Sequence, residues 1–322
     1  FSSCSPDFGE RGILDRFGQI EPKVYVACDG YWYNGKRVSI ADKLKNVVPH
    51  MASLARTVIV PYLGEAEEVA AGLTNGVSLD AFTAPFAPAP LTFERLPFNH
   101  PAFILFSSGT TGVPKCIVHG AGGTLLQHIK EHRLQCDLKP GERLFYFTTC
   151  GWMMWNWLVT GLASGLTLCL FDGSPFAPSP DVLWDYAQDE RFALFGTSAK
   201  YIDSLRKEGV RPGETHDLSA LKAMTSTGSP LAPADFAYVY EAIKKDLHLA
   251  SISGGTDIVS CFVLGDPTSP VWRGEIQAPG LGMAVEVWSD EGERVFGERG
   301  ELVCTRPFPC MPVMFWNDPE GA

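Results

Sequence analysis

The segment that most constrains this chain is residues 103–119, with the sequence FILFSSGTTGVPKCIVH. An apolar strand expected over residues 102–106 runs directly into a stretch of glycines and hydroxyl residues. Glycines permit close approach to an anion, successive N–H groups can surround phosphate oxygens, and hydroxyls and a lysine add donors and charge. The sequence therefore predicts a phosphate-binding loop, whose residues are Ser107, Ser108, Gly109, Thr110, Thr111, Gly112 and Lys115.

The spacing of this loop excludes the P-loop of NTPases, in which Gly-Lys-Ser/Thr follows a glycine after four intervening residues. Here two residues separate Gly109 from Gly112, and Lys115 follows Pro114. The loop instead resembles the signature of the adenylate-forming superfamily, which comprises acyl-CoA synthetases, luciferases and peptide-synthetase adenylation domains. That signature is Ser/Thr-Ser-Gly-Thr-Thr-Gly-x-Pro-Lys, usually followed by glycine, so that Cys116 departs from it. The structural alternative is an ordinary Ser/Thr/Gly-rich surface turn.

Composition and charge restrict the function of the chain. At 322 residues, 45% of them hydrophobic, it can form about two or three packed units. The net charge of −11 argues against a nucleic-acid partner, because no domain-wide basic face is available. The nine cysteines include no Cys-x-x-Cys pair, and the N-terminal FSSCSPDFGERG lacks the apolar core of a signal peptide. We therefore expect a cytoplasmic enzyme with reduced thiols.

The order of the expected elements predicts an α/β fold. Mostly parallel sheets are flanked by helices, and a small antiparallel β unit lies at the C-terminal end. We expect a first, partial α/β subdomain at residues 1–100, a loop-bearing α/β subdomain at 101–265 and a truncated β subdomain at 266–322. The proline-rich stretch 83–101 is the expected connector between the first two.

The first subdomain contains the clearest local signals. Residues 1–20 are expected to be irregular, and Asn34-Gly35 marks a tight hairpin turn. Residues 38–50 have helical spacing, with Ser39 as the candidate N-cap. Strands on either side of this helix imply a parallel sheet.

Residues 144–171 carry no charge and are long enough to be a candidate membrane span. They also contain three glycines, clustered tryptophans and several polar residues, and they end at Asp172-Gly173. We therefore favour a buried strand, helix and strand within an α/β core.

Residues 128–132, HIKEH, match the His-x-x-Glu-His spacing of some zinc peptidases. His128 and His132 share one face of a helix expected over residues 124–133. Because the motif is short and no third ligand is marked, we favour an ordinary amphipathic helix over a zinc site.

Three later strands end in turns of small and hydroxyl residues, at 196–200, 228–230 and 254–257. In an open parallel sheet such turns gather at the carboxyl ends of the strands, where ligands bind. We therefore expect these turns to share one site with the phosphate-binding loop.

The superfamily resemblance assigns roles to the turn at 254–257. Adenylate-forming enzymes have a tetrapeptide ending in Thr-Glu at this point, and here it is Gly254-Gly255-Thr256-Asp257, with Asp in place of Glu. The resemblance implies that Thr256 contacts phosphate and that Asp257 binds Mg²⁺, a cation that takes one or two carboxylates together with substrate phosphates. The structural alternative is an aspartate that caps the next element. The expected nucleotide-binding residues of this turn are Gly255, Thr256 and Asp257.

The turn at 228–230 lies where the family contacts adenine. Its residues are Gly228, Ser229 and Pro230, and Ser229 replaces the common Glu, so the implied role rests on backbone and shape. The residues that the resemblance implies for catalysis are Lys115 and Thr256.

Within the superfamily the resemblance is closest to the acetoacetyl-CoA synthetases. It is carried by CSPDFGERGILDRFGQIEPKV, DGYWYNGK, FSSGTTGVPKCIVH, CGWMMWNWLVTGLASG and SGGTDI, which together span nearly the whole chain. Acetyl-specific relatives have tryptophan at the position of Gly254, so this glycine implies an acyl pocket with room for a longer acid. Trp152 is expected either to form another wall of that pocket or to pack in the core.

The resemblance implies a ligase that uses acetoacetate, ATP with Mg²⁺, and CoA. The carboxylate attacks the α-phosphorus of ATP to give an acyl adenylate and pyrophosphate, and CoA then displaces AMP. Catalysis of this kind depends on positioning and charge stabilisation. The expected partners are these small molecules, without nucleic acid and without a membrane span.

Family members carry a ribose-binding aspartate and a mobile lysine-bearing domain beyond the position of residue 322. We therefore expect this chain to be an incomplete central part, with little or no turnover by itself. Two alternatives stay open: a synthetase for another short- or medium-chain acid, and a nucleotide-binding domain without catalysis.

Overall fold

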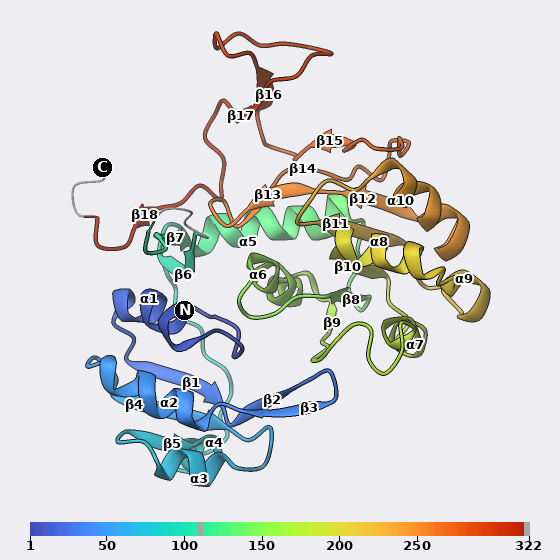
Figure 1. Ribbon diagram of the computed structural model, residues 1–322. Helices are drawn as coiled ribbons and strands as arrows, with labels where there is room; N and C mark the ends of the chain where they lie inside the picture. The colour runs from blue at the N-terminus through green and yellow to red at the C-terminus, as the bar shows by residue number, and fades with distance from the viewer. Residues whose placement is uncertain (108–111, 319–322) are drawn as a thin grey trace.

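A five-stranded parallel sheet lies at the centre of the computed structural model, which describes residues 1–107 and 112–318 (Figure 1). Its strand order is β12-β11-β10-β8-β9, and every neighbouring pair is parallel. The carboxyl ends of the strands therefore lie at one edge, as predicted for the strands before the turns at 196, 228 and 254. The strands are β8 (Arg143–Tyr146), β9 (Thr167–Cys169), β10 (Leu194–Ser198), β11 (Ala223–Thr227) and β12 (His248–Ser251).

Helices cover both faces of this sheet because its strands are apolar on both sides. Phe145 and Phe195 face one buried cluster, whereas their neighbours Leu144 and Leu194 face another. The first cluster includes residues of α7, α8 and α10, which lie together at the right of Figure 1. The second includes residues of α6. These helices are α6 (Met153–Thr160), α7 (Val182–Asp189), α8 (Ala199–Glu208) and α10 (Pro233–Tyr238).

The uncharged segment 144–171 forms β8, α6 and β9. Leu144, Trp157 and Leu166 from this segment share one buried cluster. The predicted buried strand, helix and strand are therefore confirmed. In the described part of the chain, no helix combines the length and apolar character needed to cross a bilayer.

The N-terminal region forms a second parallel sheet, in the order β1-β4-β5. The buried carboxylate of Asp29 accepts hydrogen bonds from the amides of Tyr62 (2.9 Å), Leu63 (2.7 Å) and Glu65 (2.7 Å). Burial raises the pKa of Asp29, but the three backbone donors outweigh it and the pKa is lowered. The elements of this region are β1 (Val24–Cys28), α2 (Ala41–Val47), β4 (Arg56–Val60), α3 (Ala66–Ala71), β5 (Gly76–Ser78) and α4 (Leu79–Thr83).

Two local predictions for this region were wrong. Residues 1–20 are not irregular throughout, because α1 (Glu10–Ile20) buries Ile13 and Phe17 on one face. The helix expected from residue 38 begins at Ala41, because the preceding residues form β3 (Lys36–Ser39), which pairs with β2 (Gly30–Tyr33). The hairpin itself is confirmed: its turn residues have φ values of 49° at Asn34 and 73° at Gly35.

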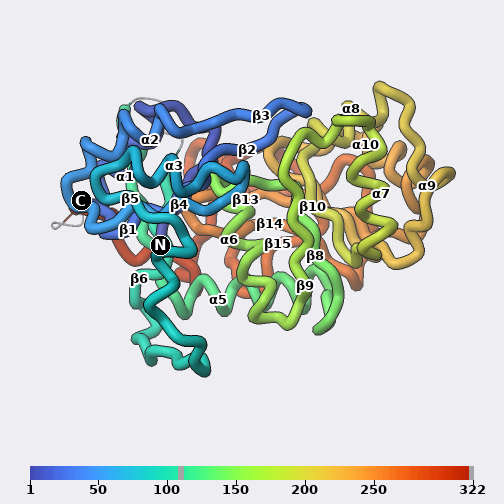
Figure 2. The backbone as a smooth tube through the Cα atoms, turned by 90° about the horizontal axis from the view of Figure 1, so that it is seen from below, coloured from blue at the N-terminus to red at the C-terminus, as the bar shows by residue number. Residues whose placement is uncertain are grey.

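The remaining strands are short and antiparallel, which confirms the small antiparallel β unit of the predicted fold class. Residues 84–100 contain no helix or strand and project as a loop beside β6 (Figure 2). The three subdomain boundaries stay a prediction. The other elements are β6 (Pro101–Phe106), β7 (Cys116–Gly120), α5 (Ala121–Lys130) with a π-helical turn (Glu131–Gln135), α9 (Pro212–Thr215), β13 (Ser253–Gly255), β14 (Ser260–Leu264), β15 (Ala278–Pro279), β16 (Val285–Trp288), β17 (Glu301–Cys304) and β18 (Met314–Phe315).

Candidate functional site

The predicted phosphate-binding loop is closed at its base by two hydrogen bonds between Ser107 and Lys115. The Lys115 amide donates to the Ser107 hydroxyl oxygen at 3.0 Å, and the Ser107 amide donates to the Lys115 carbonyl at 3.1 Å. The loop thus connects the antiparallel strands β6 and β7, in which Phe106 pairs with Cys116. Four predicted residues lie outside the described part of the chain: Ser108, Gly109, Thr110 and Thr111.

The Lys115 side chain is exposed at the mouth of this hairpin. Its Nζ lies 5.9 Å from the ring centroid of Phe315, within the range of a cation–π interaction. Beside it, the carbonyl of Pro114 accepts a hydrogen bond from Gln19 Nε2 of α1 at 2.9 Å. A Cβ added to the exposed Gly112 would meet no described atom within 4 Å. The cation is therefore held at the surface and open to an anion.

His119 lies further along β7 and was not selected from the sequence. It is fully buried, and among the described residues no group meets normal hydrogen-bond geometry at either ring nitrogen. Burial lowers the pKa of His119 to about 4, while the nearby Thr256 backbone and Asp257 carboxylate act in the opposite direction. A neutral imidazole therefore lies close to the turn predicted to bind phosphate and metal.

Thr256 and Asp257 lie in the turn of a tight hairpin between β13 and β14. Asp257 is exposed, and Thr256 is half-buried. The Val259 amide donates to the Thr256 carbonyl at 3.3 Å. Val259 has a φ of 50°, in the left-handed region that β-branched residues rarely adopt. The turn that presents Asp257 is therefore compact and strained.

The start of this hairpin is joined to the end of β11. The Ile252 amide donates to the Ser226 carbonyl at 2.9 Å, and the Thr227 hydroxyl donates to the Ile252 carbonyl at 3.4 Å. Immediately afterwards Gly228 has a φ of 88°, which favours glycine, and residues 228–230 are exposed. The turns predicted for adenine and for phosphate therefore follow neighbouring parallel strands at one edge of the sheet.

A family model described as "AMP-binding enzyme" matches residues 2–312 of this chain. The chain belongs to the AMP-binding enzyme family. The superfamily that the loop predicted is thereby confirmed.

Individual relatives cover the whole chain. A protein of Rhizobium meliloti (strain 1021) named acetoacetyl-coenzyme A synthetase is 69% identical over 322 residues, which are 100% of this chain and 49% of that protein. Acetoacetyl-CoA synthetase of Gallus gallus is 51% identical, again over 100% of this chain and 49% of its own length. The solved structure of acetoacetyl-CoA synthetase from Streptomyces lividans superposes with a TM-score of 0.92 at 46% identity, covering 99% of this chain and 49% of that one. The chain thus spans about half the length of these relatives.

In this AMP-binding family member, the two predicted acyl-pocket residues have different surroundings. Trp152 precedes α6 and its side chain is 70% exposed, so it does not pack in the core, whereas Trp157 is buried. At Gly254, an added Cβ would lie 2.0 Å from the Ser260 carbonyl oxygen of the paired strand. The close approach of β13 and β14 therefore requires a glycine here independently of any acyl group.

Asp257 fits a cation that arrives with a substrate. Its carboxylate makes no hydrogen bond or ion pair within the described part of the chain, so its oxygens are available to a ligand. One free carboxylate suits Mg²⁺ already bound to phosphates. Among the described residues, no group of three His, Cys, Asp or Glu side chains could hold a metal ion.

The His-x-x-Glu-His side chains bond to other groups of the protein. His128, Glu131 and His132 are fully buried, and the ring nitrogens of both histidines face hydroxyl and carbonyl oxygens of the chain. The expected helix is present as α5 and its π-helical turn, but it is not an ordinary amphipathic helix, because its polar face points inward while Leu125 and Leu126 are exposed.

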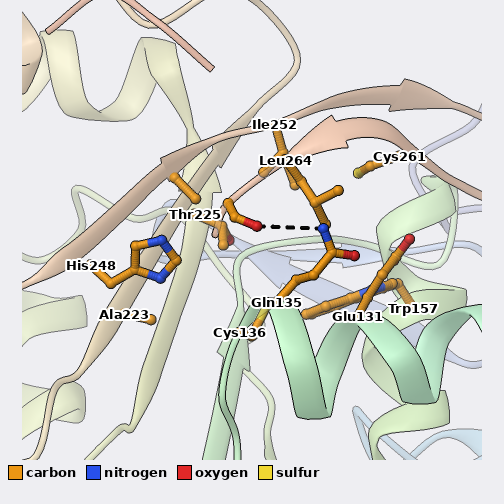
Figure 3. Close-up of a pocket in the computed structure, with 12 residues that line it drawn as sticks. Glu131, Gln135, Cys136, Trp157, Ala223, Thr225, His248, Ile252, Cys261 and Leu264 are labelled. Carbon is orange, nitrogen blue, oxygen red and sulfur yellow. Dashed lines mark hydrogen bonds between the residues drawn. The ribbon is translucent and has the colours of Figure 1, made fainter. Parts of the chain in front are cut away.

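Two enclosed or partly enclosed hollows lie away from the predicted residues. One of about 10 Å³ has room for roughly one water molecule. Figure 3 shows it between Glu131 and Trp157 on one side and His248 on the other. The other, of about 210 Å³, is lined by residues of α10 and its surroundings, including Phe236 and Arg273. Neither contains a residue predicted to bind nucleotide.

Proposed function

We propose that this chain forms the ATP-binding part of an AMP-forming acetoacetyl-CoA synthetase. A carboxylate oxygen of acetoacetate attacks the α-phosphorus of ATP, and the bond to the bridging oxygen breaks to release pyrophosphate. The CoA sulfur then attacks the acyl carbon, AMP leaves with the bonding electrons, and the thiol proton passes to solvent. A cytoplasmic location belongs to this proposal.

The observation that carries the proposal is the 69% identity, over the whole chain, to a protein named acetoacetyl-coenzyme A synthetase. The geometry agrees with this activity. An exposed cation at the base of a glycine-rich loop and an exposed carboxylate without a hydrogen-bond partner among the described residues belong to two hairpins that share one buried cluster. Leu105 of the first hairpin and Val259 of the second are both in that cluster.

The proposed roles follow from the charges. Lys115 neutralises the β- and γ-phosphates together with the loop hydroxyls, and Thr256 donates to phosphate. Asp257 binds the Mg²⁺ of Mg·ATP, which supplies positive charge to the phosphates. The turn at 228–230 holds adenine through its backbone.

Selectivity for acetoacetate is the finer part of the proposal. It rests on the names of the relatives, since Gly254 is already required by the hairpin backbone. A synthetase for another short- or medium-chain acid therefore remains the competing assignment.

Two measurements test the function. Calorimetric titration of this chain with Mg·ATP is expected to show saturable binding that Lys115→Ala and Asp257→Asn both weaken, and no saturable binding would contradict the nucleotide site. Exchange of labelled pyrophosphate into ATP by the full-length protein is expected to depend on acetoacetate more than on butyrate or propionate. Equal rates with all three acids would leave the ligase assignment intact and overturn the selectivity.

A further inference from the structure

The polar face of α5 and the π-helical turn that follows it are buried beneath the hairpin carrying Thr256 and Asp257. Gln127, His128 and Glu131 are at most 2% exposed. Burying such groups costs free energy unless each finds a partner. The partners of these three include residues of the hairpin, which lie about 130 residues later in the chain.

His128 holds the hairpin backbone directly. Its Nε2 lies 2.5 Å from the Val259 carbonyl oxygen, which can only accept, so Nε2 carries the proton. The other ring nitrogen, Nδ1, lies 2.8 Å from the Thr160 hydroxyl oxygen, which itself lies 2.8 Å from the Trp157 carbonyl. The ring is therefore held between the hairpin backbone on one side and α6 on the other.

Glu131 holds the next residue, Ser260. Its Oε1 accepts a hydrogen bond from the Ser260 hydroxyl at 2.5 Å and another from Gln127 Nε2 at 3.0 Å. Its Oε2 accepts from Trp157 Nε1 at 2.9 Å, and Figure 3 shows the two side chains next to each other. With Lys130 Nζ at 3.6 Å, the carboxylate is fixed in position.

The residue that these contacts restrain is strained. A β-branched residue such as Val259 is strained in the left-handed region, and such conformations persist where the surroundings impose them. Val259 is fully buried and lies two residues after Asp257, and its amide is bonded to the Thr256 carbonyl. The conformation of Val259 therefore affects how the turn orients the side chains of Thr256 and Asp257.

We propose that His128 and Glu131 are positioning residues, which hold Val259 and Ser260 and thereby fix the turn that presents Thr256 and Asp257 to Mg·ATP. The proposal rests on the proposed function for its ligand. It gives the inward-facing His-x-x-Glu-His stretch a role that involves no metal of its own. His132, the third residue of that stretch, is bonded instead to the Trp157 carbonyl at 3.1 Å and to Ser164 at 3.4 Å.

The decisive quantity is the gain in ATP affinity of this chain when Mg²⁺ replaces EDTA. His128→Leu and Ser260→Ala are expected to reduce this gain about fivefold, the effect of losing roughly one hydrogen bond, with little change of ATP affinity in EDTA. Asp257→Asn serves as the positive control. His132→Leu is the matched control, since it removes an equally buried histidine one turn along the helix and should leave the gain unchanged.

His128→Gln restores a donor that can reach a carbonyl, and it is expected to recover most of the gain. Ser260→Ala removes a single buried hydroxyl and keeps the test valid should His128→Leu fail to fold. A full Mg²⁺ gain in both His128→Leu and Ser260→Ala, or an equal loss in His132→Leu, would overturn the proposal.

Amide hydrogen exchange of residues 256–261 without ligand separates this inference from the nucleotide assignment. His128→Leu and Ser260→Ala are expected to speed exchange there about tenfold relative to His132→Leu, because the turn opens locally. Unchanged protection would refute the positioning role even where ATP binds. If the variants exchange faster but Mg²⁺ does not increase the ATP affinity of the wild-type chain, the positioning role stands and the proposed metal site is refuted.

Discussion

The Ser107 hydroxyl accepts a hydrogen bond from the Lys115 amide at 3.0 Å, while the Lys115 carbonyl accepts one from the Ser107 amide at 3.1 Å. The two ends of the glycine-rich loop are thus held together whatever the loop binds. Fixing the two ends of a binding segment in advance reduces the conformational entropy that ligand binding costs. We therefore expect Ser107 to support phosphate binding by holding the backbone of Lys115 in place, in addition to any hydrogen bond that it donates to phosphate.

Replacing Ser107 tests this closure. Ser107→Ala is expected to weaken Mg·ATP binding about threefold, because one of the two hydrogen bonds is lost, and to change the unfolding temperature little. Ser107→Thr keeps the hydroxyl and should bind as the wild type does. Calorimetric titration measures both, and equal affinities for the Ala and Thr variants would show that other contacts close the loop.

The positive charge of Lys115 is expected to contribute to the affinity for Mg·ATP. Lys115→Ala is expected to lower the affinity for Mg·ATP about tenfold at low salt, whereas Lys115→Arg keeps most of it because the charge is retained. Since exposed charges are screened, the difference between Ala and wild type should shrink as salt is added. A deficit that stays constant from low to high ionic strength would indicate that lost shape, not lost charge, is responsible.

Gly254 is expected to be needed for stability. In Gly254→Ala the new Cβ would lie 2.0 Å from the Ser260 carbonyl oxygen, so unfolding in urea should show a loss of about 1–3 kcal/mol. Gly18→Ala is the matched control, because its Cβ meets no described atom within 4 Å inside α1. That change should stabilise the chain by about 0.5–1 kcal/mol. If Gly254→Ala is as stable as the wild type, the hairpin backbone does not require this glycine, and the acyl pocket is left as its only explanation.

The lowered pKa of Asp29 leads us to expect that the stability of the folded chain depends on pH. Its pKa in the folded chain lies below the unfolded value of about 4, so its contribution is present above about pH 4 and is lost as the pH falls through the folded pKa. Asp29→Asn should be about 1–3 kcal/mol less stable near pH 7, since a charged acceptor of three amides is replaced by a neutral one. The gap between wild type and variant should close below about pH 4, as measured by urea unfolding at each pH. A constant gap down to about pH 2 would contradict the lowered pKa.

Sequence patterns predicted the elements whose signals are local. The strand before the loop, the Asn34-Gly35 hairpin and the buried passage at 144–171 all depend on residues close together in the chain. The helix at Glu10–Ile20 was missed, although Ile13 and Phe17 have helical spacing, because glycines and charged residues surround them. The turns at 228 and 254 follow neighbouring parallel strands, since alternation of strands and helices gives a parallel sheet whose carboxyl ends share one edge.

The inverted face of α5 could not be predicted in this way. His128 and Glu131 resemble surface or metal-binding residues when only their spacing is known. Their burial depends on Val259 and Ser260, which meet them only once the chain is folded. For the same reason nothing in the sequence marked His119 on β7, whose ring comes near Asp257 of the β13–β14 hairpin only in the folded chain.

The pairing of β18 with β7 has a consequence for how the chain folds during synthesis. Val118 and Met314 are partners although they are about 200 residues apart, and the Trp316 amide also donates to the Cys116 carbonyl at 2.9 Å. Until that late segment leaves the ribosome, the strand that follows the glycine-rich loop has one open edge. Such an edge can pair with another nascent chain, so slow translation before residues 314–316 should favour aggregation at this strand.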